Sequence, residues 1–308
     1  MEIKNNEQYV GFGLSIVNRF TRNWKLHAKD TIMGILSSIK HGKASPTLTY
    51  RHKAHEVAEE AYKAGFRIFD TARIYGYSES ELGKMAALHN REDLFICTKV
   101  SDMDLTRKGG AKTVRGNLLN SLKDLGMDYV DLYLLHWPSG EWIDMYKQMD
   151  ELYKEGLARH IGVCNFKLSD FEALSQIPGI TMPQFCQIEC HPFCMHQDVL
   201  EYCKAHNISV LAHTPTGRMK QDVKRDEALN QIAKTHGKSV PQIVLRWHIQ
   251  SGRIPITHTK KVSHIKDNID IFAFSLTENE IKKINALNQE KSLFRFVGID
   301  NPNYKYNK

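Results

Sequence analysis

Short apolar runs rich in β-branched residues alternate with longer amphipathic segments along most of this sequence, from about residue 30 onward. Runs of this length and composition predict β-strands. Because the intervening segments are long enough to hold a helix, we expect parallel strands joined by crossover helices. The predicted strands are Thr31–Ser38, Phe66–Asp70, Leu94–Lys99, Val130–His136, Ala158–Cys164, Phe185–Glu189, Ser209–His213 and Ile254–Thr257.

The segments between these runs show helical periodicity. In His52–Ala64, for example, Ala54, Val57, Ala58 and Ala61 fall on one face. The predicted helices are His52–Ala64, Thr113–Leu125, Ser169–Ser175, Asp198–His206, Arg225–His236, Val240–Gln250 and Val262–Asn268.

Eight strands favour a closed (β/α)8 barrel, or TIM barrel, over an open doubly wound sheet. A doubly wound dinucleotide-binding sheet needs a G-x-G-x-x-G fingerprint after a strand, and no strand–helix junction here carries one. We find no repeat or linker, so we expect residues 1–308 to form one domain. Residues 1–30 are predicted to form an N-terminal hairpin from Tyr9–Val17 and Trp24–Ala28. Residues 291–308 are predicted to form a tail whose Phe294, Phe296 and Tyr304 fold over the active site.

The charge balance disfavours two classes of partner. The 42 basic and 35 acidic residues give a net charge of +7, a mild excess that suits attraction of phosphorylated small molecules. The basic residues form no long run, so we expect no nucleic-acid partner. No stretch of about 18 apolar residues occurs and the N-terminus lacks a secretory pattern, so we expect no membrane partner and a cytoplasmic location. The sequence gives no signal of oligomeric state.

Six cysteines in a chain of 308 residues do not form a disulfide framework. Cys186, Cys190 and Cys194 are evenly spaced and have His191 and His196 nearby, so a zinc site is one interpretation. The sequence has no C-x2-C pair there, and strand alternation splits the side chains between two faces. We therefore favour small buried hydrophobic residues and expect no metal.

Reactive side chains stand at three consecutive strand ends. Asp70 and the nearby Tyr75 follow the second strand, Lys99 ends the third and His136 ends the fourth. A barrel places such residues around one pocket at the carboxyl ends of its strands. A lysine ammonium lowers the pKa of a neighbouring phenol, so Tyr75 is a candidate general acid toward a carbonyl oxygen, with His136 orienting that carbonyl. An aldolase or lyase using Lys99 as a Schiff base is an alternative, disfavoured by the adjacent carboxylate and phenol.

Several segments resemble the signature segments of aldo-keto reductases in their order and spacing. They are FDTARIYGYSESELGK, FICTKV, DLYLLHWP, IGVCNF, QIECHP and IPITHTKKVSHIKDN, and they run from about Phe66 to Leu287. The resemblance implies a (β/α)8 barrel that binds NADPH without a dinucleotide fingerprint and reduces an aldehyde or ketone. It implies Tyr75 as proton donor, Asp70 and Lys99 as its tuning pair, and His136 as the group that orients the carbonyl.

The resemblance also implies a set of cofactor-binding residues. Cys164, Asn165 and Gln187 would hold the nicotinamide carboxamide, although a serine is usual at the position of Cys164. His213 stands where an aromatic ring normally stacks on the nicotinamide, and Thr214, Pro215, Thr216 and Gly217 would line the pyrophosphate. The adenosine phosphate and adenine would contact Thr259, Lys260, His264 and Asn268. Lys260 supplies positive charge for the phosphate, which favours NADPH.

The substrate pocket is expected to come from loops, and Trp137, His191 and Phe193 are the candidate lining residues for a small carbonyl compound. The departures at Cys164 and His213 leave one further alternative, a catalytically silent family member that binds cofactor or senses redox state. Retention of all four catalytic residue types argues against it. The physiological direction and the particular carbonyl are not indicated.

Overall fold

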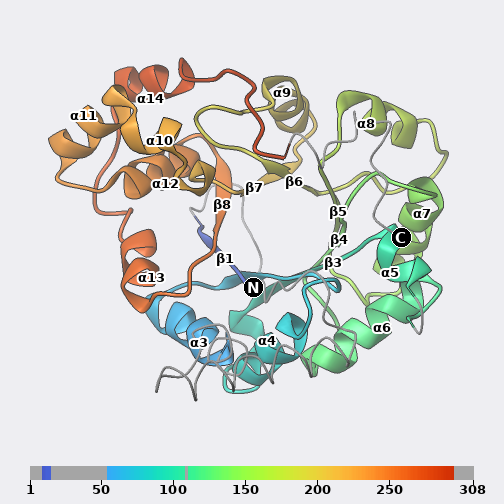
Figure 1. The fold of residues 1–308 in the computed structure, drawn as a ribbon. Coiled ribbons are helices and arrows are strands. Elements are labelled where there is room, and N and C mark those ends of the chain that lie inside the picture. Colours follow the sequence, from blue (N-terminus) through green and yellow to red (C-terminus); the bar gives the residue numbers. More distant parts are fainter. Residues whose placement is uncertain (1–8, 15–53, 108–109, 295–308) are drawn as a thin grey trace, which may run out of the picture.

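Eight parallel strands close into a barrel with helices around it (Figure 1). The computed structural model describes residues 9–14, 54–107 and 110–294. Each strand pairs with its neighbours in sequence, and the first also pairs with the last. The predicted (β/α)8 barrel is therefore confirmed. The strands are β1 (Gly11–Gly13), β2 (Ile68–Asp70), β3 (Phe95–Val100), β4 (Leu132–Leu135), β5 (Ile161–Cys164), β6 (Phe185–Glu189), β7 (Ser209–His213) and β8 (Arg253–Thr257).

The helices form the outer layer of the barrel (Figure 1). They are α3 (Ala54–Ala64), α4 (Ser78–Ala86), α5 (Asp102–Thr106), α6 (Val114–Leu125), α7 (Trp142–Lys154), α8 (Leu168–Ser175), α9 (Gln197–Ala205), α10 (Gln221–Arg225), α11 (Glu227–His236), α12 (Val240–Gln250), α13 (Val262–Ile269) and α14 (Glu278–Asn285), with short 3-10 turns at Arg91–Asp93 and Gly217–Met219. Within the described part of the chain, none of these helices is long and apolar enough to cross a membrane.

The first strand is not where the sequence pattern predicted it. Gly11–Gly13 pairs in parallel with β2 and β8, so this part of the expected N-terminal hairpin is a barrel strand instead. Glycine is uncommon in strands, so a pattern of β-branched residues does not mark this segment as one. Their small size is required here, because a Cβ on Gly11 would lie 2.3 Å from Cδ1 of Ile256. The run Thr31–Ser38 lies outside the described residues.

Strand alternation divides the core into two layers. Inside the barrel lie Ile68, Phe95, Cys97, Leu132, Leu134, Cys164, Phe185, Leu211, Ile254 and Ile256. A second, larger cluster fills the space between the strands and the helices. Because side chains two apart share a face, the next inward position after Ile68 is Asp70, after Cys97 it is Lys99, and after Leu134 it is His136. The apolar interior thus directs these polar groups to the carboxyl end of the barrel.

Candidate active site at the carboxyl ends of the strands

Lys99 lies fully buried at the end of β3 and makes three hydrogen bonds. Its Nζ donates to both carboxylate oxygens of Asp70, each at 2.6 Å, and to the carbonyl of Thr71 at 2.8 Å. Burial alone would lower the pKa of Lys99, but the carboxylate of Asp70 raises it overall. The amine is therefore held as a charged ammonium with all three protons donated, which argues against the Schiff-base alternative.

Tyr75 reaches from the turn after β2 to His136 at the end of β4. The Tyr75 hydroxyl lies 3.3 Å from Nε2 of His136, and the two rings meet edge to face. Nζ of Lys99 is 5.4 Å from the centre of the Tyr75 ring. The structure therefore brings together the four residues that the strand ends predicted.

The expected lowering of the Tyr75 pKa is wrong as a net effect. Burial raises the pKa of Tyr75 to about 12, and the nearby Lys99 only partly offsets this increase. Burial also lowers the pKa of His136 well below its usual value, and Lys99 adds to that shift. At neutral pH both groups are uncharged, a phenol that holds its proton beside a neutral imidazole. Among the described residues, Nδ1 of His136 has no hydrogen-bond partner.

Gln187 and Asn165 tie neighbouring strand ends to this group. Gln187, on β6, donates from Nε2 to Oδ1 of Asp70 at 2.8 Å. Asn165 lies just after β5, and its Nδ2 donates a hydrogen bond to the carbonyl of His136 at 3.2 Å. Its Oδ1 is 3.0 Å from Nε2 of His213. Asn165 has a φ of 60°, a backbone conformation that asparagine tolerates better than most residues. The predicted carboxamide-binding residues are thus joined to the predicted catalytic ones.

A model of the Aldo/keto reductase family matches residues 41–289 of the sequence. The chain belongs to this family. It is similar to the glyoxal reductase of Bacillus subtilis (strain 168), with 37% identity over 242 residues that cover 78% of this chain and 85% of that protein. It is likewise similar to the methylglyoxal reductase DkgA of Escherichia coli O157:H7, with 37% identity over 240 residues that cover 76% and 84% of the two chains.

Solved structures of aldo-keto reductases share the architecture. The enzyme MGS-M4 from a Medee basin deep-sea metagenome library superposes with a TM-score of 0.74 at 35% identity, covering 82% of this chain and 92% of that one. The Bombyx mori aldo-keto reductase AKR2E4, solved in complex with NADP, gives 0.73 at 27% identity and covers 92% and 90%. The family resemblance inferred from the sequence motifs is therefore confirmed.

His213 of this aldo/keto reductase is held as a neutral ring. Its Nε2 faces Oδ1 of Asn165, and its Nδ1 lies 3.3 Å from the Thr214 hydroxyl. Burial lowers the pKa of His213 to about 4. With a proton on Nε2 the imidazole donates to Asn165 and accepts from Thr214. Position 213 therefore carries no charge at neutral pH.

The loop after β7 carries an unusual backbone. Thr214 has a φ of 55°, and Gly217, Arg218 and Met219 follow with values of 56°, 52° and 48°. Positive φ values at non-glycine residues are uncommon and gather at functional sites. At Gly217 a Cβ would also lie 2.8 Å from Cγ2 of Val223. This shape fits the pyrophosphate-binding role expected for residues 214–217.

The predicted adenosine-binding residues lie at the start of α13. The Thr259 hydroxyl accepts a hydrogen bond from the backbone N–H of Lys261 at 3.1 Å, just before the helix begins. Lys260 and His264 are exposed, and Asn268 is half-buried. Two cationic or titratable side chains therefore face solvent near one helix N-terminus, as a phosphate-binding edge would require.

Of the three candidate substrate residues, only Trp137 accompanies the catalytic group. Its ring stacks on that of His136, with the centroids 5.6 Å apart. Instead, Nε2 of His191 lies 3.2 Å from Oε1 of Glu189. Nδ1 of His191 accepts a hydrogen bond from the backbone N–H of Phe193. His191 is 2% exposed and Phe193 belongs to the outer core cluster. These two residues shape the loop and do not line a pocket through exposed side chains.

Phe294 supports part of the expectation for the C-terminal tail, because its ring meets His213 edge to face at 5.5 Å. The guanidinium of Arg218 lies over Phe294, 4.6 Å from the ring centre, so the post-β7 loop and the tail meet there. No motif in the sequence singles out Arg218. Phe296 and Tyr304 lie outside the described residues.

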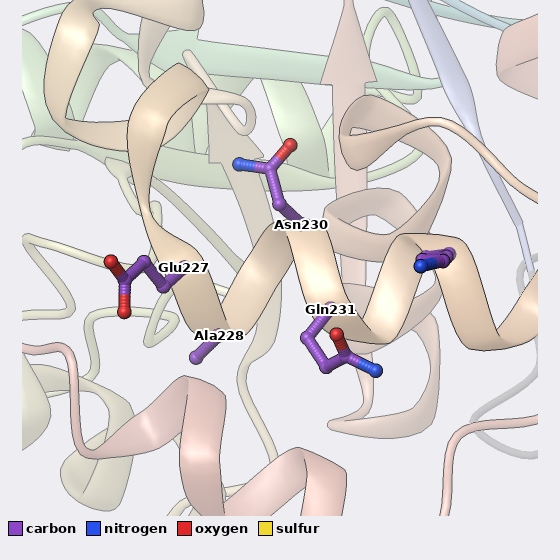
Figure 2. A pocket seen from close by; sticks show the side chains of 5 residues that line it. Glu227, Ala228, Asn230 and Gln231 are labelled. Atoms are coloured by element: carbon purple, nitrogen blue, oxygen red, sulfur yellow. The ribbon is translucent and has the colours of Figure 1, made fainter.

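An open pocket on the outer layer of this aldo/keto reductase is formed by α11 alone (Figure 2). Its lining residues are Glu227, Ala228, Asn230, Gln231 and Lys234. Among the described residues, no other element contributes a side chain to this lining, and α11 stands outside the strands (Figure 1). The pocket is therefore separate from the chemistry at the strand ends.

Proposed function

We propose that this protein is an NADPH-dependent reductase that converts an aldehyde or ketone to an alcohol, and that residues 1–308 form its single domain. The contact that carries the proposal is the 3.3 Å approach of the Tyr75 hydroxyl to Nε2 of His136, beside the buried Lys99–Asp70 pair. In this proposal Tyr75 is the proton donor, His136 orients the carbonyl, and Lys99 and Asp70 position and tune Tyr75.

The protonation states support Tyr75 as the acid. With a pKa of about 12, Tyr75 carries its proton at neutral pH, and the neutral His136 can donate one hydrogen bond to the substrate oxygen. Bound NADPH would supply a hydride to the carbonyl carbon. As negative charge develops on the oxygen, Tyr75 transfers its proton there, and the Lys99 ammonium stabilises the tyrosinate that is left.

The residues around the acid fit a nicotinamide cofactor by their chemistry. Asn165 and Gln187 offer amide groups to a carboxamide, and the neutral His213 offers a flat ring face to the nicotinamide. The Cys164 thiol, also buried there, is a weaker hydrogen-bonding group than the usual serine. Thr214, Pro215, Thr216 and Gly217 would line the pyrophosphate, and Thr259, Lys260, His264 and Asn268 the adenosine end.

The preference for NADPH over NADH rests on Lys260 and His264. Both side chains are exposed at the start of α13, where a phosphate would also meet the positive end of the helix dipole. The NADP complex of the similar Bombyx mori protein supports the same cofactor. Small carbonyl compounds are the proposed substrates, with Trp137 as one wall, because two similar proteins are named for glyoxal and methylglyoxal.

The test is NADPH consumption with methylglyoxal and with an activated aromatic aldehyde, using the wild type and Tyr75→Phe. We expect the variant to lose on the order of 100- to 10,000-fold in kcat, as removal of a general acid does, while its NADPH affinity stays within about twofold. Tyr133→Phe is the matched control. Tyr133 is buried on β4, its hydroxyl has no hydrogen-bond partner among the described residues, and it packs in the outer cluster.

Full activity in Tyr75→Phe would overturn the mechanism. Tight NADPH binding by the wild type without turnover of any carbonyl would favour the silent cofactor-binding alternative instead.

A further inference from the structure

Three metal-binding side chains meet in the loop that follows β6, outside the proposed catalytic group. The Cys194 thiol, a His196 ring nitrogen and a Glu189 carboxylate oxygen all lie within 4.8 Å of one another. Sγ of Cys194 is 3.4 Å from Nε2 of His196. We propose that Glu189, Cys194 and His196 bind a zinc ion. This proposal does not rest on the proposed reductase function.

The backbone of the loop directs these side chains toward each other. Glu189 ends β6, and the backbone groups of His191 and Cys194 then exchange two hydrogen bonds of 2.9 Å, which close a tight turn. His196 follows in the left-handed conformation, with φ 51° and ψ 57°, immediately before α9. This conformation is uncommon for a residue other than glycine. The turn and the left-handed residue bring the Cys194 and His196 side chains to one point.

The spacing is close to that of a zinc site. With Zn–S near 2.3 Å and Zn–N or Zn–O near 2.0 Å, tetrahedral geometry puts ligand atoms about 3.3–3.6 Å apart. The Cys194–His196 distance already falls in this range, and the longest distance in the set, which is within 4.8 Å, needs to shorten by at most about 1.2–1.5 Å. Thiolate, imidazole and carboxylate are all zinc ligands, and three protein ligands leave a fourth position for water.

Glu290 lies beside His196, where metal-binding histidines usually have a supporting carboxylate. Its Oε2 lies 3.9 Å from Nδ1 of His196 and 4.0 Å from Sγ of Cys194, and it accepts the His196 backbone N–H at 3.1 Å. Shortening the Oε2–Nδ1 distance to that of a hydrogen bond would fix the tautomer that leaves Nε2 free to bind a metal. The His196 side chain is 39% exposed, so an ion can enter from solvent, while Glu189 and Cys194 are buried.

Zinc binding at this site would release one proton. Cysteine binds zinc as the thiolate, so the Cys194 thiol gives up its proton as the zinc–sulfur bond forms. The Glu189 carboxylate accepts hydrogen bonds from the Ser292 hydroxyl and from the backbone N–H of Leu293. The balanced step is zinc ion plus thiol giving a zinc–thiolate bond and one proton to solvent.

The proposed site lies beside a junction between two distant parts of the chain. The segment after α14 is held on the β6–α9 loop by hydrogen bonds from Leu293 and Ser292 to Glu189, and from Met195 to Asn288. This segment carries Phe294 to the ring of His213. A zinc ion would hold residues 189–196 in the conformation on which that segment packs, and we expect it to raise the melting temperature of the protein.

The first test is titration of the metal-free, full-length protein with Co²⁺, which reports thiolate ligation through a sulfur-to-cobalt charge-transfer band. We expect one equivalent to saturate this band, one proton to be released, and Zn²⁺ to displace the cobalt. Cys194→Ser is expected to lose the band. The matched control is Cys203→Ser, which changes a buried cysteine on α9 outside the proposed ligand set, and it should retain the band.

Two further variants protect the test against loss of folding at the buried cysteine. His196→Asn removes the ring while keeping a residue that tolerates the left-handed conformation, and should weaken Zn²⁺ binding on the order of 100-fold. Glu290→Gln should weaken it by about 10- to 100-fold, as loss of a supporting carboxylate does. His206→Asn, at the exposed end of α9, is the matched histidine control and should bind as the wild type does.

The proposal fails if the wild type shows no stoichiometric charge-transfer band. It also fails if the band survives in Cys194→Ser, or if His196→Asn and His206→Asn bind Zn²⁺ equally well. The Tyr75→Phe variant should bind cobalt as the wild type does, which separates this inference from the test of the reductase mechanism.

Discussion

The Lys99–Asp70 pair offers a direct measure of how strongly the barrel interior depends on charge pairing. Lys99 is 0% exposed and Asp70 is 5% exposed. Asp70→Asn leaves a buried ammonium with the Thr71 carbonyl and a neutral amide as its partners. Lys99→Met leaves a buried carboxylate whose described donor is Nε2 of Gln187. Either change leaves a buried charge without its counter-charge.

We expect each single variant to lower the free energy of unfolding by about 3–5 kcal/mol, the usual cost of breaking one partner from a buried ion pair. The double variant Asp70→Asn/Lys99→Met removes both charges. Its loss should be at least about 2 kcal/mol smaller than the sum of the two single losses, because no unpaired charge remains.

Urea unfolding followed by circular dichroism at pH 7, without cofactor, measures all three variants against the wild type. Lys147→Met is the matched control, since Lys147 pairs with Asp144 at 3.3 Å on the exposed face of α7 and should cost less than about 1 kcal/mol. Single losses below about 1 kcal/mol, or losses that add within about 0.5 kcal/mol, would refute the account of the buried pair.

Two other features give predictions of their own. Gly11→Ala should lower the free energy of unfolding by about 1–3 kcal/mol through the clash with Ile256. In urea unfolding, the double variant Gly11→Ala/Ile256→Ala should lose less than the sum of the two single losses, because the shortened side chain no longer meets the added methyl group. An unchanged Gly11→Ala would show that β1 has room to move. For His213, the folded pKa of about 4 lies below the usual 6.5, so the unfolded chain binds the extra proton and stability falls as the pH drops from about 6.5 toward 4. The free energy of unfolding, measured by thermal unfolding, should therefore fall less between pH 7 and pH 5 in His213→Gln than in the wild type, by about 1–2 kcal/mol. An equal fall in both proteins would exclude His213 as a source of acid sensitivity.

The sequence predicted two strands with the bounds that the structure has, Phe185–Glu189 and Ser209–His213. Each is a short run with buried apolar residues, and the run ends at a polar side chain. Gly11–Gly13 is held in the barrel by backbone pairing and close contact with Ile256, and neither leaves a pattern in the sequence.

Some helices escaped prediction for local reasons. α14 begins with a capping box in which Thr277 and Glu280 bind each other's backbone N–H groups. The spacing of these two residues is a helix-start signal that the sequence does carry. The N-cap residue before α4 is Tyr77, whose side chain makes no cap hydrogen bond to the helix. The helix buries Glu79 and Glu81 as well as apolar residues. Its periodicity is therefore masked by buried charge, which only tertiary contacts such as that between Arg73 and Glu79 explain.

Three of the proposed catalytic residues, Asp70, Lys99 and His136, were predictable because alternation along each strand fixes which side chains reach the barrel end. Their electrostatics were not, since Lys99 and burial act on the Tyr75 pKa in opposite directions and sequence gives no depth of burial. The same limit applies to metal binding. Even spacing drew attention to Cys186, Cys190 and Cys194, whereas the structure groups Cys194 with His196 and Glu189. That grouping depends on a turn and a left-handed residue, which spacing alone does not encode.

His213 shows how a departure from the family pattern becomes part of the structure around it. Nε2 of its ring contacts Oδ1 of Asn165, and Nδ2 of the same Asn165 donates a hydrogen bond to the His136 carbonyl. A tyrosine at position 213 would add ring area for stacking but has no nitrogen at the place that faces Asn165. The asparagine would then lose one of its two described side-chain contacts beside His136, the histidine that we propose orients the carbonyl. The gain from a larger ring is therefore opposed by a looser His136, so position 213 and Asn165 have to be considered as one unit.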